Sequence, residues 1–127
     1  MATRRLKLYF DGGCRPNPGP IEAAVVLRGS ARYFDDLGTG TSRDAEWLAL
    51  IRAAELAREE GVDDAILVGD ALGVIREAAA ALATGRAGST HAATFLTAVS
   101  VLPALRVRWI KRQQNLAGIA LAAHHPR

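Results

Sequence analysis

Residues 6–20 read LKLYFDGGCRPNPGP, and this stretch decides how the chain begins to fold. Apolar and polar side chains alternate over residues 5–11, which predicts a strand with one buried face. Residues 12–20 hold three glycines and three prolines, which exclude a regular element and predict a tight connection. Asp11 stands at the junction, so the first strand is expected to end in a carboxylate.

The same signals divide the rest of the chain into short elements. Strands are predicted at 23–28, 32–37, 65–69 and 105–110, and helices at 42–60, 70–83, 89–101 and 114–123, with Asp70 as the cap of the second helix. A meander of three strands followed by strand–helix alternation is typical of an α/β domain with one mixed sheet. We expect residues 1–127 to form a single domain with helices on both faces of that sheet.

Charge is distributed unevenly along the chain. The net charge is +3, yet all thirteen acidic residues occur by Glu77, and residues 78–127 carry six basic side chains and no acidic one. A purely basic second half favours a polyanionic partner, nucleic acid above all. The alternative is a basic surface that only aids solubility.

Three further expectations concern the environment of the protein. No long apolar run resembles a membrane span, and residues 1–11 lack the apolar core of a signal peptide. A single cysteine, Cys14, cannot form an internal disulfide, which suits a reducing cytoplasm. We therefore expect a cytoplasmic protein without a membrane partner, and a monomer.

Three carboxylates occupy predicted element ends: Asp11 closes the first strand, Glu46 lies in the first turns of the first helix, and Asp70 follows the strand at 65–69. If their strands are neighbours, these side chains converge and raise one another's pKa unless cations neutralise them. Mg²⁺ prefers such oxygen ligands, and two ions about 4 Å apart can drive phosphodiester hydrolysis. Taken singly, the three residues could instead start a turn, favour a helix dipole and cap a helix.

Four segments resemble type 1 ribonuclease H, in family order and spacing. They are residues 9–14 with 17–20 (YFDGGC, NPGP), 41–46 with 48–50 (TSRDAE, LAL), 68–72 with 74–75 (VGDAL, VI) and 109–115 with 121–122 (WIKRQQN, LA). The resemblance implies an α/β, ribonuclease H-like, five-stranded mixed sheet. It also implies endonucleolytic cleavage of the RNA strand in RNA–DNA hybrids. Asp11, Glu46 and Asp70 correspond to that family's metal ligands for Mg²⁺ or Mn²⁺, with two ions expected when substrate is bound.

The resemblance also indicates where a nucleic acid binds. Asn17, Ser42 and Arg43 match positions that contact the minor groove of the hybrid, where 2′-hydroxyls distinguish RNA from DNA. Lys111 and Arg112 are candidates for phosphate contacts. The expected partner is an RNA–DNA hybrid, and double-stranded RNA is a second partner that the sequence does not exclude.

One position departs from the family pattern. Ile119 stands where the family has a fourth carboxylate, which helps to hold the metal that activates water. His124, His125 or the C-terminal carboxylate would have to replace it, although histidine nitrogens suit Mg²⁺ poorly. The alternative to a weakened enzyme is therefore a catalytically silent module that binds hybrid or duplex RNA.

Three large apolar side chains are expected in the interior. Trp109 alternates with apolar residues of its strand, which favours core packing over base stacking. Trp47 follows Glu46 in the first helix, where packing is again expected. Ile119 is expected to pack inward.

Overall fold

The computed structural model of the protein describes residues 4–124. The strands are β1 (Arg5–Cys14), β2 (Gly19–Leu27), β3 (Ser30–Phe34), β4 (Thr39–Gly40), β5 (Asp64–Gly69) and β6 (Ala104–Trp109). The helices are α1 (Ser42–Glu59), α2 (Leu72–Thr84), α3 (Thr90–Val99), the 3₁₀ turn η1 (Arg112–Gln114) and α4 (Leu116–His124).

Five strands form the main sheet in the order β3-β2-β1-β5-β6, and the two-residue β4 pairs with β2. The first three strands are antiparallel, whereas β5 and β6 run parallel to β1. The expected mixed sheet, three antiparallel strands followed by parallel ones, is thus confirmed.

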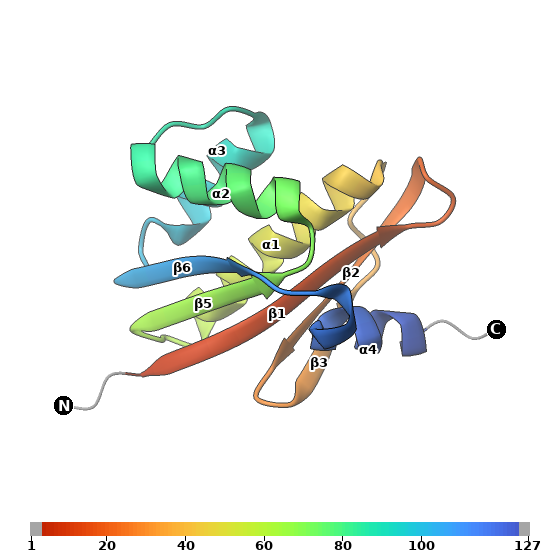
Figure 1. Ribbon diagram of the computed structural model, residues 1–127, viewed down its shortest axis with the longest axis horizontal. Coiled ribbons are helices and arrows are strands. Elements are labelled where there is room, and N and C mark those ends of the chain that lie inside the picture. The colour runs from red at the N-terminus through yellow and green to blue at the C-terminus, as the bar shows by residue number, and fades with distance from the viewer. Residues whose placement is uncertain (1–3, 125–127) are drawn as a thin grey trace.

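Helices cover both faces of the sheet (Figure 1). Helices α1, α2 and α3 lie together on one face, with α1 packed across β1, β2 and β5. Helix α4 lies alone on the other face, against β1, β2 and β3. Strand β1 is therefore covered by α1 on one face and by α4 on the other.

The main hydrophobic core fills the space between the sheet and α1 to α3. Strand alternation turns Leu8 and Phe10 toward this side, where they pack with Trp47 and Leu50 of α1, and all four are almost completely buried. The expectation that Trp47 packs in the core is confirmed. A smaller cluster, Ala24, Val26, Ala117 and Leu121, joins α4 to β2 on the opposite face.

The register of β1 differs between its two neighbours. Its antiparallel pairing with β2 continues to Cys14, opposite Ile21, but its parallel pairing with β5 stops at Tyr9, opposite Val68. Strand β1 is therefore longer than predicted and does not end at Asp11. Beyond Tyr9, one edge of β1 is free of strand partners, and this open edge positions the site described below.

Three sequence predictions are wrong in detail. Trp109 is 44% exposed and Ile119 is 54% exposed, so neither packs inward. In the described part of the chain β6 lies at an edge of the sheet, and even its inward-alternating residues Leu105 and Val107 are only half-buried. The residue that caps α2 is Ala71, without a side-chain hydrogen bond, so Asp70 is not that cap.

None of the helices in the described part of the chain combines the length and apolar character needed to span a membrane.

Candidate metal centre

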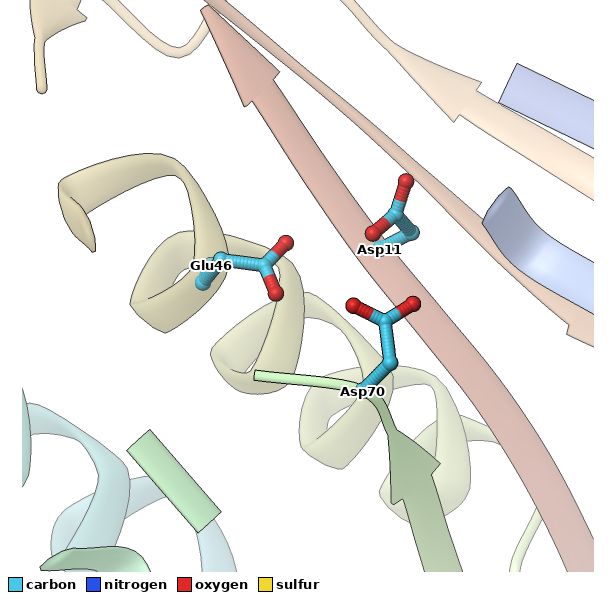
Figure 2. A group of neighbouring side chains, drawn as sticks. All are labelled: Asp11, Glu46 and Asp70. Carbon is cyan, nitrogen blue, oxygen red and sulfur yellow. The ribbon is translucent and has the colours of Figure 1, made fainter. Parts of the chain in front are cut away.

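Three carboxylates converge at the open edge of β1. Asp11 comes from β1, Glu46 from the first turns of α1, and Asp70 from the residue after β5 (Figure 2). One oxygen of each side chain lies within 4.8 Å of the oxygens of the other two. The structure thus brings together the three residues that the sequence analysis singled out.

Glu46 is held by the unpaired edge of β1. The N–H of Gly12 has no strand partner there and donates a hydrogen bond of 2.5 Å to Glu46 Oε1. Helix α1 can come this close because Gly12 lacks a side chain: a Cβ at this position would lie 2.1 Å from the carbonyl oxygen of Ala45. This glycine therefore sets the distance between α1 and β1.

Asp70 is fixed by contacts with three other elements. The preceding Gly69 lies beneath the ring of Phe10, since a Cβ there would stand 2.4 Å from Phe10 Cζ. The buried Asn115 donates from Nδ2 to Asp70 Oδ2 (2.9 Å) and to the Phe10 carbonyl (3.0 Å). Trp109 Nε1 donates to the Asp70 carbonyl at 3.1 Å. Strands β1, β5 and β6 and the start of α4 thus share one anchor at Asp70.

Burial and mutual repulsion change how readily these groups ionise. Burial, together with the negative charge of Asp70, raises the pKa of Asp11 from 3.8 to about 6. Burial, and next the charge of Asp11, raises the pKa of Glu46 from 4.5 to about 9. In the absence of a cation, Glu46 therefore keeps its proton at neutral pH.

The donor set suits a hard divalent cation. All three side chains offer carboxylate oxygens, the ligands that Mg²⁺ and Mn²⁺ accept most readily. A cation among them would remove the repulsion that raises the two pKa values. The residues present therefore fit a divalent metal ion.

The raised pKa values predict a pH-dependent stability. Each carboxyl has a higher pKa in the folded metal-free protein than in the unfolded chain: about 6 against 3.8 for Asp11, and about 9 against 4.5 for Glu46. Between these two values the folded protein keeps a proton that the unfolded chain has released. This contribution to the free energy of unfolding is present at low pH and is lost as pH rises through each folded-state pKa. We expect Glu46→Gln, which mimics the protonated side chain, to become progressively more stable than the wild type between pH 6 and about 9. Urea unfolding in EDTA across this range measures the difference, and a constant difference would contradict it.

The predicted nucleic-acid ligands lie beside the carboxylates, with one exception. Asn17 Oδ1 accepts a hydrogen bond of 3.1 Å from the backbone N–H of Ser42, so these two residues are adjacent at the start of α1. Ser42 also lines the pocket that contains the three carboxylates. Arg43 instead forms an ion pair with Glu77 of α2. A minor-groove contact by Arg43 would require it to leave this partner.

The two predicted phosphate ligands lie on the connection from β6 to α4. Arg112 lines the same pocket, and its positive charge partly lowers the pKa of Asp11. Lys111 precedes it and is exposed to solvent. Arg112 therefore borders the acidic cluster, and Lys111 is its exposed neighbour in the sequence.

Helix α4 presents no carboxylate to the cluster. Its Gly118 lies near Asp11, since a Cβ there would stand 3.5 Å from Asp11 Oδ2. Ile119 is one turn beyond Asn115, with its N–H bonded to the Asn115 carbonyl at 3.1 Å. His124 stacks on Tyr33 of β3 with ring centroids 4.0 Å apart, whereas His125 and the C-terminal carboxylate lie outside the described residues.

Sequence reasoning missed two residues of this region. Asn115 was quoted only as part of a motif, although its side chain connects α4, β1 and Asp70. Glu22, in β2, lines the pocket beside Asp11. The only local signal for Glu22 was a charged side chain in an otherwise apolar strand.

Comparison of sequences gives one well-defined relative. No protein-family model matches the chain. Over 71 residues the chain is 42% identical to the ribonuclease HI of Halobacterium salinarum, a match that covers 52% of this chain and 36% of that protein. The chain thus spans little more than a third of this curated relative's length.

Solved structures with the same fold cover nearly the whole chain. Ribonuclease H1 of Halobacterium salinarum superposes with a TM-score of 0.74 at 26% identity, over 94% of this chain and 98% of that one. A compost-derived ribonuclease H1 in complex with an RNA/DNA hybrid gives a TM-score of 0.66 at 27% identity, over 87% and 88% of the two chains. The N-terminal ribonuclease H domain of a Mycobacterium tuberculosis protein, at 22% identity and a TM-score of 0.72 over 95% and 96%, supports the fold alone. Sequence identity and fold thus lead to the same group of proteins: the chain has a ribonuclease H-like fold and is similar to type 1 ribonucleases H.

Proposed function

We propose that this protein is a ribonuclease H that hydrolyses the RNA strand of RNA–DNA hybrids, with Mg²⁺ or Mn²⁺ held by Asp11, Glu46 and Asp70. The observation that carries the proposal is the gathering of these three carboxylates within 4.8 Å. A relative of the same fold was solved with an RNA/DNA hybrid, which supports the substrate class. When bound, divalent ions activate a water molecule and stabilise the leaving oxygen in phosphodiester hydrolysis.

The residues of this chain have distinct roles in that reaction. Asp11 and Glu46 must be deprotonated to bind a cation, so binding releases the proton that Glu46 holds in the free protein. Asn115 orients Asp70 through the bond from Nδ2 to Oδ2. The Gly12 N–H holds Oε1 of Glu46 at the open edge of β1.

Substrate is held around the pocket of about 490 Å³ that contains the carboxylates. Ser42 lines the pocket and its backbone N–H donates to Asn17, so these two neutral polar side chains would read 2′-hydroxyls in the minor groove. Arg112 lines the same pocket, and with its sequence neighbour Lys111 it would neutralise phosphates. Under this proposal, different elements recognise the RNA and hold its backbone.

Cleavage of a labelled hybrid in Mg²⁺ or Mn²⁺ tests the proposal. The same strand in a DNA duplex and in double-stranded RNA serves as the substrate comparison. Cut RNA that appears only in the hybrid supports the proposal, and equal cutting of double-stranded RNA widens the substrate class. No cutting in either metal contradicts it.

One observation favours a second candidate function, a module that binds hybrids without cutting them. Helix α4 has no carboxylate among its residues Leu116–His124, and the residues with which it lines the pocket beside Asp11 are Gly118, Leu121 and Ala122. Under this alternative, Ile119→Asp converts a binding protein into a nuclease, because position 119 follows Asn115 on the helix by one turn. Tight hybrid binding by the wild type without cleavage, together with cleavage by Ile119→Asp, would establish the silent module. Cleavage by the wild type contradicts it.

We expect Arg112→Ala to weaken hybrid binding about tenfold and Lys111→Ala to weaken it less. Each phosphate contact removed lowers the slope of log affinity against log salt by roughly 0.7–0.9. Fluorescence anisotropy at several salt concentrations, in EDTA to prevent cleavage, measures both quantities. Arg58→Ala, at the far end of α1, is the matched control for loss of one surface charge. An unchanged salt slope in Arg112→Ala would remove Arg112 from the binding surface.

A further inference from the structure

Glu22 occupies a distinctive position in the pocket of the candidate metal centre. It lies on β2 directly opposite Gly13, and it lines the pocket together with Asp11, Glu46 and Asp70. Asp11 and Gly13 are two residues apart on β1, so their positions face the same side of the sheet. That side is the one covered by α4. Glu22 therefore approaches Asp11 from β2, whereas Glu46 approaches from α1 on the open edge of β1.

Two glycines leave space between Glu22 and Asp11. A Cβ at Gly13 would stand 3.5 Å from Glu22 Oε1, so the Glu22 carboxylate lies directly over this glycine. A Cβ at Gly118 of α4 would stand 3.5 Å from Asp11 Oδ2. A Cβ at Gly13 would also stand 3.7 Å from Leu121 Cδ2, so the two glycines and Leu121 of α4 border the space beside the two carboxylates.

One oxygen of Asp11 is turned away from the other two carboxylates of the cluster. In Figure 2, one of its oxygens is directed toward Glu46 and Asp70, and the other points away from both. The negative charge of Glu22 also contributes to the raised pKa of Asp11, which places the two groups within electrostatic reach.

We propose that Glu22 is a metal ligand: with Asp11, it holds a second divalent cation on the α4 side of the sheet. The inference rests on the proposed function and specifies its site further. It supplies from β2 the carboxylate that α4 lacks, since Leu116–His124 contain neither Asp nor Glu. Asp11 would then serve both cations, with Glu22 as the further ligand of the second one.

A structural role for Glu22 is the competing explanation. Arg15 and Arg112 line the same pocket, and Glu22 could simply neutralise one of them. The two explanations differ in their response to metal. Loss of a metal ligand changes cation binding, whereas loss of an arginine partner changes stability equally with and without the cation.

The experiment is a Mn²⁺ titration of the metal-free protein by calorimetry and by electron paramagnetic resonance, which counts free Mn²⁺. It compares the wild type with Glu22→Gln, which keeps the shape of the side chain, and with Asp70→Asn. Glu59→Gln, an exposed substitution on α1, is the control for the loss of one negative charge. Thermal unfolding with and without Mn²⁺ gives a second readout.

We expect two Mn²⁺ ions in the wild type and in Glu59→Gln. In Glu22→Gln the weaker ion should bind at least tenfold less tightly while the tighter one is retained, and the rise in Tm caused by Mn²⁺ should shrink. Hybrid cleavage should then require at least tenfold more Mn²⁺ for half-maximal rate. Two unchanged dissociation constants in Glu22→Gln, or a single Mn²⁺ in the wild type, would overturn the inference.

These failures are separable from failure of the proposed function. If Glu22→Gln binds Mn²⁺ normally while Asp70→Asn loses both Mn²⁺ binding and hybrid cleavage, the nuclease assignment stands and only the role of Glu22 falls. If the wild type cuts no hybrid in either metal, the nuclease assignment falls whatever Glu22 binds.

Discussion

Asp70→Asn will lower the rate of hybrid cleavage at least about a thousandfold while leaving the fold intact. Loss of one of three carboxylates removes about 4 kcal/mol or more of transition-state stabilisation, because each 1.36 kcal/mol is a factor of ten in rate. The side-chain oxygen of asparagine can still accept the hydrogen bond from Asn115 that Asp70 accepts at 2.9 Å. Single-turnover cleavage of a labelled hybrid in saturating Mg²⁺ measures the loss.

The same variant carries an internal check on folding. Removing the charge of Asp70 relieves repulsion that raises the pKa of both Asp11 and Glu46, so Asp70→Asn should be at least as stable as the wild type in EDTA. Asp36→Asn, at an exposed position outside the site, is the matched control and should keep full activity. Residual cleavage within tenfold of the wild type would show that Asp70 does not hold the catalytic metal.

Gly12→Ala is expected to produce the largest loss of stability, about 3 kcal/mol or more. The added Cβ would stand 2.1 Å from the Ala45 carbonyl oxygen and 2.8 Å from the Glu46 nitrogen, so β1 and α1 must separate. Overpacking against side chains typically costs 1–3 kcal/mol, and here the obstacle is backbone, which cannot rotate away. Cleavage should fall as well, because Glu46 loses the N–H of residue 12 as its anchor.

Urea unfolding of the metal-free protein measures this effect. Gly88→Ala is the control, because a Cβ at Gly88 meets no atom within 4 Å. A free energy of unfolding for Gly12→Ala within 0.5 kcal/mol of the control, the usual range of a neutral surface substitution, would show that α1 can shift without penalty.

The three clustered carboxylates were predictable because each has a local signal. Asp11 and Asp70 follow apolar runs that read as strands, and Glu46 lies in the first turns of a helical pattern. Parallel β1 and β5 are neighbours in the sheet, so residues near their carboxyl ends had to meet. The mixed sheet was predictable for the same reason, since element type and order depend on periodicity within short windows.

Other details could not be predicted, because they depend on which neighbours an element has. The alternation at 105–110 indicated a strand but not that β6 is an edge strand, so Trp109 was placed in the core and is 44% exposed. Glycines and prolines indicated that the first strand ends near Asp11, yet pairing with β2 extends it to Cys14. Ile119 was expected inside because it is apolar, but the position that faces Asp11 is Gly118.

Periodicity, turn residues and the order of acidic positions were enough to define an α/β domain and the three carboxylates that gather in it. The packing distances were decided only in three dimensions. Asn115 reaches Asp70, Glu22 lies over Gly13, and α1 rests on Gly12, and none of these contacts joins residues close in sequence. The physical reason is that local patterns follow from the conformational preferences of a few adjacent residues, whereas such contacts depend on how layers of the fold pack against one another.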